Sequence, residues 1–384
     1  MEFHILYALA SAVVCLALYR YLGLITRDRN HSPEEHTFTP AKARHVENRE
    51  KERHTESPYL IDAFPGGRNF ETVYGTIQIF EFGPEEGEKV LMVHGLSTPC
   101  IALGNMAREF VSKGYRVMIF DLFGRGYSDA PNDVKYDARL YTSQILLVLS
   151  SSPLSWAGTS AFHMVGFSLG GSIAVAFGAY HAHMLRSMTL VCPGGLIRKS
   201  LMSRRSQFLY SSGLIPEWMR IRHIRSSLEP RNGAPCADVP EESHHADIDF
   251  DDVPIAADQP RVRVGDVIKW QLEANPGFVS AYLSTIRSAL VYRRHDRIWR
   301  VLGSELARRR GIDVPPPGLQ GGRILLILAE RDVTVVKDDT IEDIQTVLSL
   351  EDVDMHVMKG GHEVAVSQGK GVASVAMQYW DRQQ

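Results

Sequence analysis

The stretch Gly166-Phe167-Ser168-Leu169-Gly170 decides the fold of this chain, and it joins an apolar run, Phe162–Val165, to a helix-compatible run, Ser172–Tyr180. This order predicts that Ser168 lies on a sharp turn between a strand and a helix, the geometry of a nucleophile elbow. Such a turn strains the backbone of the serine and leaves space only for glycine two positions away on either side. We expect the Ser168 hydroxyl to stand exposed above a sheet.

A bare motif of this kind also occurs by chance in ordinary loops, so the rest of the chain has to support it. Four further apolar runs have the length of strands: Lys89–Val93, Arg116–Phe120, Ile324–Leu328 and Val353–Met358. They are followed by His94-Gly95-Leu96, by Asp121–Asp129, by Asp332 and by His362, respectively. Because the carboxyl ends of parallel strands gather at one edge of a sheet, Ser168, Asp332 and His362 are predicted to meet there.

With this order of serine, acid and histidine, the chain resembles the α/β-hydrolase superfamily, which includes esterases, monoacylglycerol lipases and ring-cleavage product hydrolases. The resemblance covers roughly residues 70–380 and rests on the His94-Gly95 turn, the Asp121–Asp129 segment, the elbow, Asp332 and His362. It implies an α/β fold, with a mostly parallel central sheet flanked by helices and a mainly helical cap insert over the active site.

The three residue types suit acyl transfer. His362 would accept the Ser168 proton during attack and return it to the leaving group, while Asp332 holds the imidazole tautomer and stabilises the imidazolium. Rival acids follow closely along the chain, at Asp338, Asp339 and Asp343, but they lie past the end of the predicted strand. The catalytic triad is therefore predicted to be Ser168, Asp332 and His362.

The backbone amide of Leu169, the residue after the nucleophile, is expected to supply one donor of an oxyanion hole. The resemblance implies that the other donor is the amide of Leu96. Dehalogenases and epoxide hydrolases of this fold use a carboxylate where this chain has Ser168, so their chemistry is disfavoured.

Length and composition fit one catalytic domain with additions. The chain has 384 residues, of which 44% are hydrophobic and 23% charged, as in ordinary globular proteins. Its net charge of −3 gives no overall positive field that would attract nucleic acid. We expect core segments at residues 60–194 and 320–384, and a cap insert at 195–319 with a flexible acidic segment at 226–260. His244 and His245 in that segment are not expected to form a metal site, and no cofactor is predicted.

Residues 1–25 are predicted to be a membrane anchor. An apolar helix over Phe3–Ile25 could cross a bilayer core of about 30 Å. Positive residues come after the charge-free part, Phe3–Tyr19, at Arg20, Arg27 and Arg29, which favours a cytosolic catalytic domain. The endoplasmic reticulum and other lipid-associated membranes are the candidate locations. The alternative is a cleaved signal peptide, under which Asn30 would become a glycosylation site.

Residues 26–59 are closely mixed in charge and are predicted to form a linker. The four cysteines have no metal or disulfide spacing, which fits a reducing compartment.

The main hypothesis is a membrane-tethered serine hydrolase of carboxylic esters, with acyl lipids such as monoacylglycerols favoured. Cleavage of a carbon–carbon bond, a thioester or a lactone by the same triad remains open, as does a non-catalytic binding module.

Overall fold

The computed structural model describes residues 11–20, 37–39, 57–159, 161–202, 204–211, 215–230, 250–288, 291–293, 296–310 and 314–383. The chain divides into two compact units, Met1–Thr37 and Phe38–Gln384. In the first unit, residues 11–20 are helical and exposed. Within the described ranges, no helix combines the length and the apolar character that crossing a bilayer requires. The rest of the proposed anchor and Asn30 lie outside those ranges, so the anchor stays a prediction.

The second unit contains an eight-stranded sheet in the order β12-β11-β8-β7-β4-β5-β3-β2. The strands are β2 (Gly67–Thr72), β3 (Gly75–Phe82), β4 (Lys89–Val93), β5 (Arg116–Phe120), β7 (Phe162–Phe167), β8 (Leu185–Val191), β11 (Ile324–Ala329) and β12 (Val353–Met358). Among the described strands of this sheet, only the β2–β3 and β3–β5 pairs are antiparallel. The predicted α/β class with a mostly parallel sheet is confirmed, and every predicted strand is present within two residues of its expected ends.

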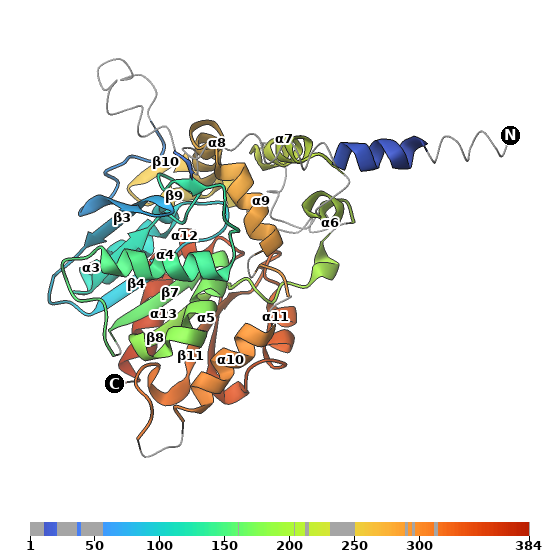
Figure 1. Ribbon diagram of the computed structural model, residues 1–384. Helices are drawn as coiled ribbons and strands as arrows, with labels where there is room; N and C mark the ends of the chain where they lie inside the picture. Colours follow the sequence, from blue (N-terminus) through green and yellow to red (C-terminus); the bar gives the residue numbers. More distant parts are fainter. Residues whose placement is uncertain are drawn as a thin grey trace, which may run out of the picture. The chain divides into compact units, whose positions relative to one another are not determined.

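Helices cover both faces of this sheet (Figure 1). The helices around the sheet are α3 (Gly104–Ser112), α4 (Ala138–Ser150), α5 (Leu169–His181), α10 (Asp296–Ala307), α11 (Lys337–Ile344), α12 (Val364–Ser367) and α13 (Gly369–Asp381). On β8, Met188 contacts Gly178 of α5, whereas Thr189 accepts a hydrogen bond from Trp380 of α13. Consecutive residues of a strand point to opposite faces, so α5 and α13 lie on opposite sides of the sheet.

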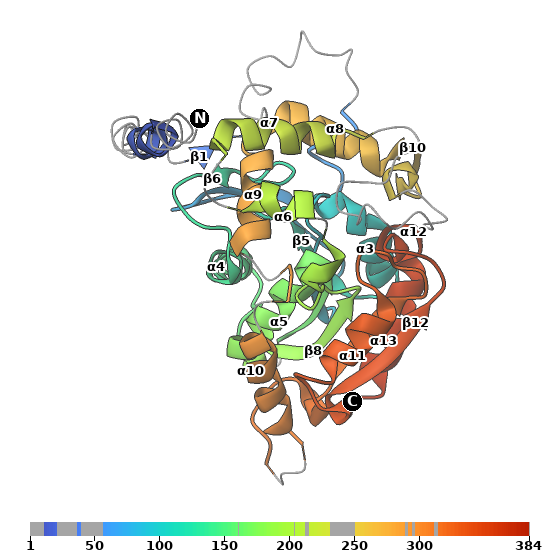
Figure 2. The same cartoon turned by 90° about the vertical axis from the view of Figure 1, so that its right-hand side faces the viewer.

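Between β8 and β11 the chain leaves the sheet. This segment contains η3 (Lys199–Leu201), α6 (Arg204–Tyr210), α7 (Glu217–Leu228), η4 (Phe250–Asp252), β9 (Pro254–Ala256), β10 (Gln259–Arg263), α8 (Val264–Ala274), α9 (Phe278–Ser288) and α10. Figure 2 shows α6, α7, α8 and α9 together at one end of the unit, with α10 at the other end. Helix α10 packs against α5 instead, through Leu302 beside Gly178. Residues 231–249, which include His244 and His245, are outside the described ranges.

The remaining elements are short. They are β1 (Thr37–Phe38), η1 (Cys100–Leu103), β6 (Ala130–Pro131), η2 (Ala182–Met184), η5 (Gln320–Gly322) and η6 (Leu350–Asp352). The hydrophobic core lies on both faces of the central strands. Every residue of β7 and β11 is buried, as expected for parallel strands that are covered on both faces.

Candidate active site

Ser168 lies between β7 and α5 at a tight turn. Its backbone has φ 53° and ψ −117°, a region that L-residues rarely adopt and that costs about 1–3 kcal/mol. A Cβ atom on Gly166 would lie 2.3 Å from the carbonyl oxygen of Gly170, and one on Gly170 would lie 2.1 Å from that of Val93. The Ser168 amide donates to the Val191 carbonyl at 3.0 Å. Close backbone contacts therefore require both glycines of the motif and hold the serine in place.

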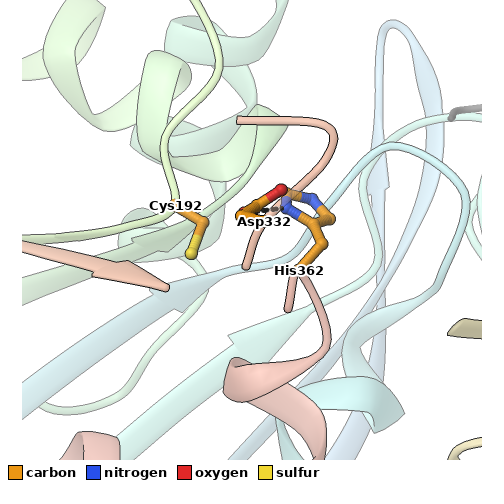
Figure 3. Close-up of side chains that lie close together, drawn as sticks. All are labelled: Cys192, Asp332 and His362. Atoms are coloured by element: carbon orange, nitrogen blue, oxygen red, sulfur yellow. Dashed lines mark hydrogen bonds and ion pairs between the residues drawn. The ribbon is translucent and has the colours of Figure 1, made fainter. Parts of the chain in front are cut away.

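The side chains of Ser168, His362 and Asp332 form one hydrogen-bonded chain. Ser168 Oγ lies 3.0 Å from His362 Nε2, and His362 Nδ1 lies 2.7 Å from Asp332 Oδ2, a pair drawn in Figure 3. Asp332 Oδ1 accepts from the amides of Thr334 at 2.8 Å and Val335 at 2.7 Å. With its Nδ1 proton directed to the carboxylate, His362 offers Nε2 as the acceptor for the serine proton.

The rival acids on and near α11 have other partners. Asp339 Oδ1 accepts from Arg198 Nη1 at 3.0 Å, and the buried Asp343 accepts from Arg198 Nε at 2.7 Å and also from Arg293. Burial alone would raise the pKa of Asp343, but the hydrogen bonds and charges of the two arginines lower it overall. Asp338 is exposed beside Lys337. Of the four candidates, the structure brings only Asp332 to His362.

Cys192, directly after β8, lies beside the acid and the histidine (Figure 3). One potential ligand atom each of Cys192, Asp332 and His362 lies within 4.8 Å of the others. Burial and the charge of Asp332 raise the thiol pKa well above its usual value, so the sulfur is protonated at neutral pH. A protonated thiol and a carboxylate already bound by three N–H groups fit a hydrogen-bonded site better than a metal site. Nothing in the local sequence around Cys192 signals this position.

The turn after β4 lies against the serine, because a Cβ atom on Gly95 would be 3.5 Å from the Cβ atom of Ser168. On the other side, Leu169 is the first residue of α5, and an amide at this position has no acceptor within its helix. The N-terminus of α5 also carries a partial positive charge. The two amides named from the sequence, Leu96 and Leu169, thus belong to the two segments that flank the Ser168 side chain.

His94 holds this turn in place and is itself neutral. Its Nδ1 donates to the carbonyl of Gly95 at 2.9 Å, and its Nε2 accepts from the amide of Leu122 at 2.8 Å. Burial, with a contribution from the nearby charge of Arg125, lowers the pKa of His94 to about 3. In a trans peptide the carbonyl of Gly95 and the N–H of Leu96 point in opposite directions, so the His94 bond sets the direction of that N–H.

The segment Asp121–Asp129 holds the chain that follows this turn. The buried Asp121 carboxylate accepts from the amide of Cys100 at 2.9 Å and from that of Tyr127 at 2.9 Å. Burial raises the pKa of Asp121, although these hydrogen bonds oppose the shift. A Cβ atom on Gly126 would lie 2.1 Å from Asp121 Oδ2, which explains the glycine. The segment therefore organises the backbone around the site and does not join the triad.

Comparison with known proteins agrees with this geometry. The sequence profile of the Alpha/beta hydrolase family matches residues 90–375, which is well over half of the chain and contains all three triad positions. The chain belongs to the alpha/beta hydrolase family.

Three similar proteins illustrate the range of the relatives. A probable lysophospholipase, BODYGUARD 4 of Arabidopsis thaliana, is 31% identical over 110 residues, which are 28% of this chain and 25% of the relative. The 2-hydroxymuconate semialdehyde hydrolase of Pseudomonas sp. strain CF600 is 29% identical over 29% of this chain and 38% of its own length. The esterase RhEst1 of Rhodococcus sp. ECU1013 has 16% identity and a TM-score of 0.53 over 83% of this chain and 100% of its own. The chain thus matches under two fifths of each curated relative, and the solved structure supports the fold alone.

Proposed function

We propose that this member of the alpha/beta hydrolase family is a serine hydrolase that cleaves carboxylic esters through an acyl-enzyme on Ser168. The observation that carries the proposal is the continuous hydrogen-bonded chain from Ser168 Oγ through His362 to Asp332. A serine hydroxyl is a weak nucleophile at neutral pH, and an adjacent base oriented by a carboxylate is what activates it.

In the proposed reaction, Ser168 Oγ attacks the ester carbonyl carbon while its proton passes to His362 Nε2. The carbonyl oxygen becomes an oxyanion that accepts hydrogen bonds from the amides of Leu96 and Leu169. The bond between the former carbonyl carbon and the alkoxy oxygen then breaks, His362 gives its proton to that oxygen so that the alcohol leaves, and the acyl group stays on Ser168 as an ester. A water molecule, deprotonated by His362, attacks this ester; the bond between the acyl carbon and Ser168 Oγ breaks, Oγ takes the proton back from His362, and the carboxylic acid leaves.

We further propose that the substrate is an acyl lipid, with monoacylglycerols the favoured class. The likeness to a probable lysophospholipase supports a lipid ester, and the apolar N-terminal stretch supports work at a membrane. A tether on residues 1–25 would raise the local concentration of a substrate that partitions into lipid. The catalytic unit would lie in the cytosol, at the endoplasmic reticulum or another lipid-associated membrane, with helices α6 to α9 as a cap over the site.

Cleavage of a carbon–carbon bond is a second candidate, favoured by the likeness to 2-hydroxymuconate semialdehyde hydrolase. The same serine, histidine and acid serve both reactions, so the substrate decides between them. A panel of monoacylglycerols of graded chain length, a thioester, a lactone and a ring-cleavage product, assayed on the full chain, separates the candidates.

Labelling with a fluorophosphonate tests the serine chemistry directly. The wild-type chain is expected to label, and Ser168→Ala is expected to lose both labelling and ester hydrolysis because it lacks the nucleophilic oxygen. Loss of the serine in a comparable triad costs on the order of a millionfold in turnover. The matched control is Ser172→Ala, one turn later in α5, where the hydroxyl donates to the Leu169 carbonyl and is not part of the triad. Activity above a tenth of wild type in Ser168→Ala would overturn the assignment.

A further inference from the structure

Three successive carbonyl oxygens in the turn after β4 each accept a hydrogen bond from a buried side chain. The bonds are His94 Nδ1 to Gly95 at 2.9 Å, Arg125 Nε to Leu96 at 3.0 Å and Gln271 Nε2 to Ser97 at 2.8 Å. A carbonyl bond fixes the peptide plane to which it belongs. The three bonds therefore set three consecutive planes, the first of which carries the N–H of Leu96.

Gln271 belongs to α8, in the segment between β8 and β11, and it is fully buried. While its Nε2 donates to the Ser97 carbonyl, its Oε1 accepts from the amide of Gly126 at 2.9 Å. Both ends of one side-chain amide are thus bound to the backbone of two different loops. An apolar side chain at this position would leave a buried acceptor and a buried donor without these bonds.

Arg125 makes a second connection to the same segment. The fully buried guanidinium donates from Nε to Leu96 and from Nη2 to Thr285 Oγ1 of α9, at 3.2 Å. Tyr141 of α4 lies 2.7 Å from the same hydroxyl, which itself donates to the carbonyl of Ala281. Because the Arg125 guanidinium is held at both Nε and Nη2, the peptide plane of the Leu96 carbonyl has little freedom to rotate.

We propose that Gln271 is a positioning residue through which the segment between β8 and β11 sets the geometry of the oxyanion hole. Helix α9 contributes to the same function through Thr285 and Arg125. The inference rests on the proposed function, because it assigns the N–H of Leu96 to the oxyanion. An oxyanion donor stabilises the transition state only when it lies at hydrogen-bond distance from the developing charge, so a shift of the turn lowers kcat more than it raises KM.

The experiment compares two buried glutamines, each of which bridges two backbone groups with its side-chain amide. Gln271→Met removes the amide at nearly constant length, and Gln271→Glu keeps an acceptor for Gly126 but loses the donor for Ser97. The control is Gln144→Met: the Gln144 amide, also buried, bridges the Phe123 amide at 3.1 Å and the Asp121 carbonyl at 3.0 Å without touching the turn. For the full chain and each variant, kcat and KM are measured on a water-soluble ester, together with thermal stability. Inhibition by a trifluoromethyl ketone, which adds Ser168 to form a bound oxyanion, provides an independent readout.

Both Gln271 variants are expected to lose about tenfold to a hundredfold in kcat and a similar factor in ketone affinity, with KM within about threefold of wild type. Gln144→Met is expected to lose stability but to keep kcat and ketone affinity within about threefold. If Gln271→Met does not fold, Gln271→Glu and Thr285→Val decide the question by the same measurements. Folded Gln271 variants with normal kcat, or an equal kcat loss in Gln144→Met, would overturn the inference. A wild-type chain that neither labels nor hydrolyses esters would instead overturn the proposed function.

Discussion

The residues of the candidate site are held by backbone groups as much as by one another. Asp332 is the clearest case, because one of its oxygens binds two amides of its own loop while the other binds His362. This arrangement orients the carboxylate before any substrate arrives, and preorganised polar groups are the largest source of catalysis in many enzymes. The acid can therefore be tested by a change that preserves its shape.

Asp332→Asn is expected to lower kcat by about ten-thousandfold with little loss of stability. The amide oxygen can still accept from Thr334 and Val335, but the amide nitrogen then faces His362 and favours the wrong imidazole tautomer. The measurements are kcat on a water-soluble ester and the midpoint of urea unfolding. Asp339→Asn is the matched control, since Asp339 binds Arg198 and not the histidine. The triad would be misplaced if the control lost its activity and Asp332→Asn kept it.

At the scale of elements, the ends of β4 and β5 are joined by one buried imidazole. His94 follows β4, and its Nε2 accepts from the Leu122 amide after β5. Because the bond from the Leu122 amide requires an unprotonated Nε2, protonation of His94 would break the connection between the two strand ends. A pH dependence of stability follows from this geometry.

We expect the free energy of unfolding to fall as the pH drops from about 6.5 towards 3. His94 has a folded pKa of about 3, below the usual value of about 6.5 in the unfolded chain, so the unfolded state binds more protons in this window. The contribution is complete above pH 6.5, and about 2 kcal/mol of it is lost between pH 7 and pH 5. Urea unfolding at both pH values measures this loss in the wild type and in His94→Asn. Since other groups titrate equally in both chains, identical losses would contradict the prediction.

At the scale of the whole molecule, every residue assigned to the site lies in the unit Phe38–Gln384. A unit with its own core is expected to fold without the chain that precedes it. The N-terminal stretch can then be removed to separate catalysis from location.

A chain lacking Met1–Arg29 is expected to fractionate as soluble protein and to keep full activity on a short water-soluble ester. Towards a monoacylglycerol held in vesicles it is expected to be weaker, because the proposed tether no longer concentrates it at the lipid. The full-length chain, as the control, should stay in the membrane pellet after carbonate washing. Protease added outside sealed microsomes should digest its catalytic unit. Secretion of a shortened form, or protection inside the microsomes, would exclude a cytosol-facing anchor.

The sequence by itself determined the strands and the elbow. Runs such as Val90–Val93 and Ile324–Leu328 are buried on both faces of a parallel sheet, so their apolar character shows locally and the strand ends could be read within two residues. Gly166 records a steric limit between near neighbours in the chain, because its Cβ would meet the Gly170 carbonyl, whereas the limit at Gly170 comes from Val93 on the adjacent strand. Since parallel strand ends share one edge, the meeting of Ser168, Asp332 and His362 also followed from the order of the elements.

Only the tertiary structure decided which groups surround these residues. Asp343 binds Arg198, 145 positions away, Cys192 comes to lie beside Asp332, and Gln271 reaches Ser97 from 174 residues further along. Helix α10, expected within the cap segment, packs on α5 instead. Such contacts depend on how distant helices pack against the sheet, and hydrophobic periodicity records only which face of each element is buried. The residue types of the active site are therefore a local property of this chain, whereas its supporting hydrogen bonds are a property of the fold.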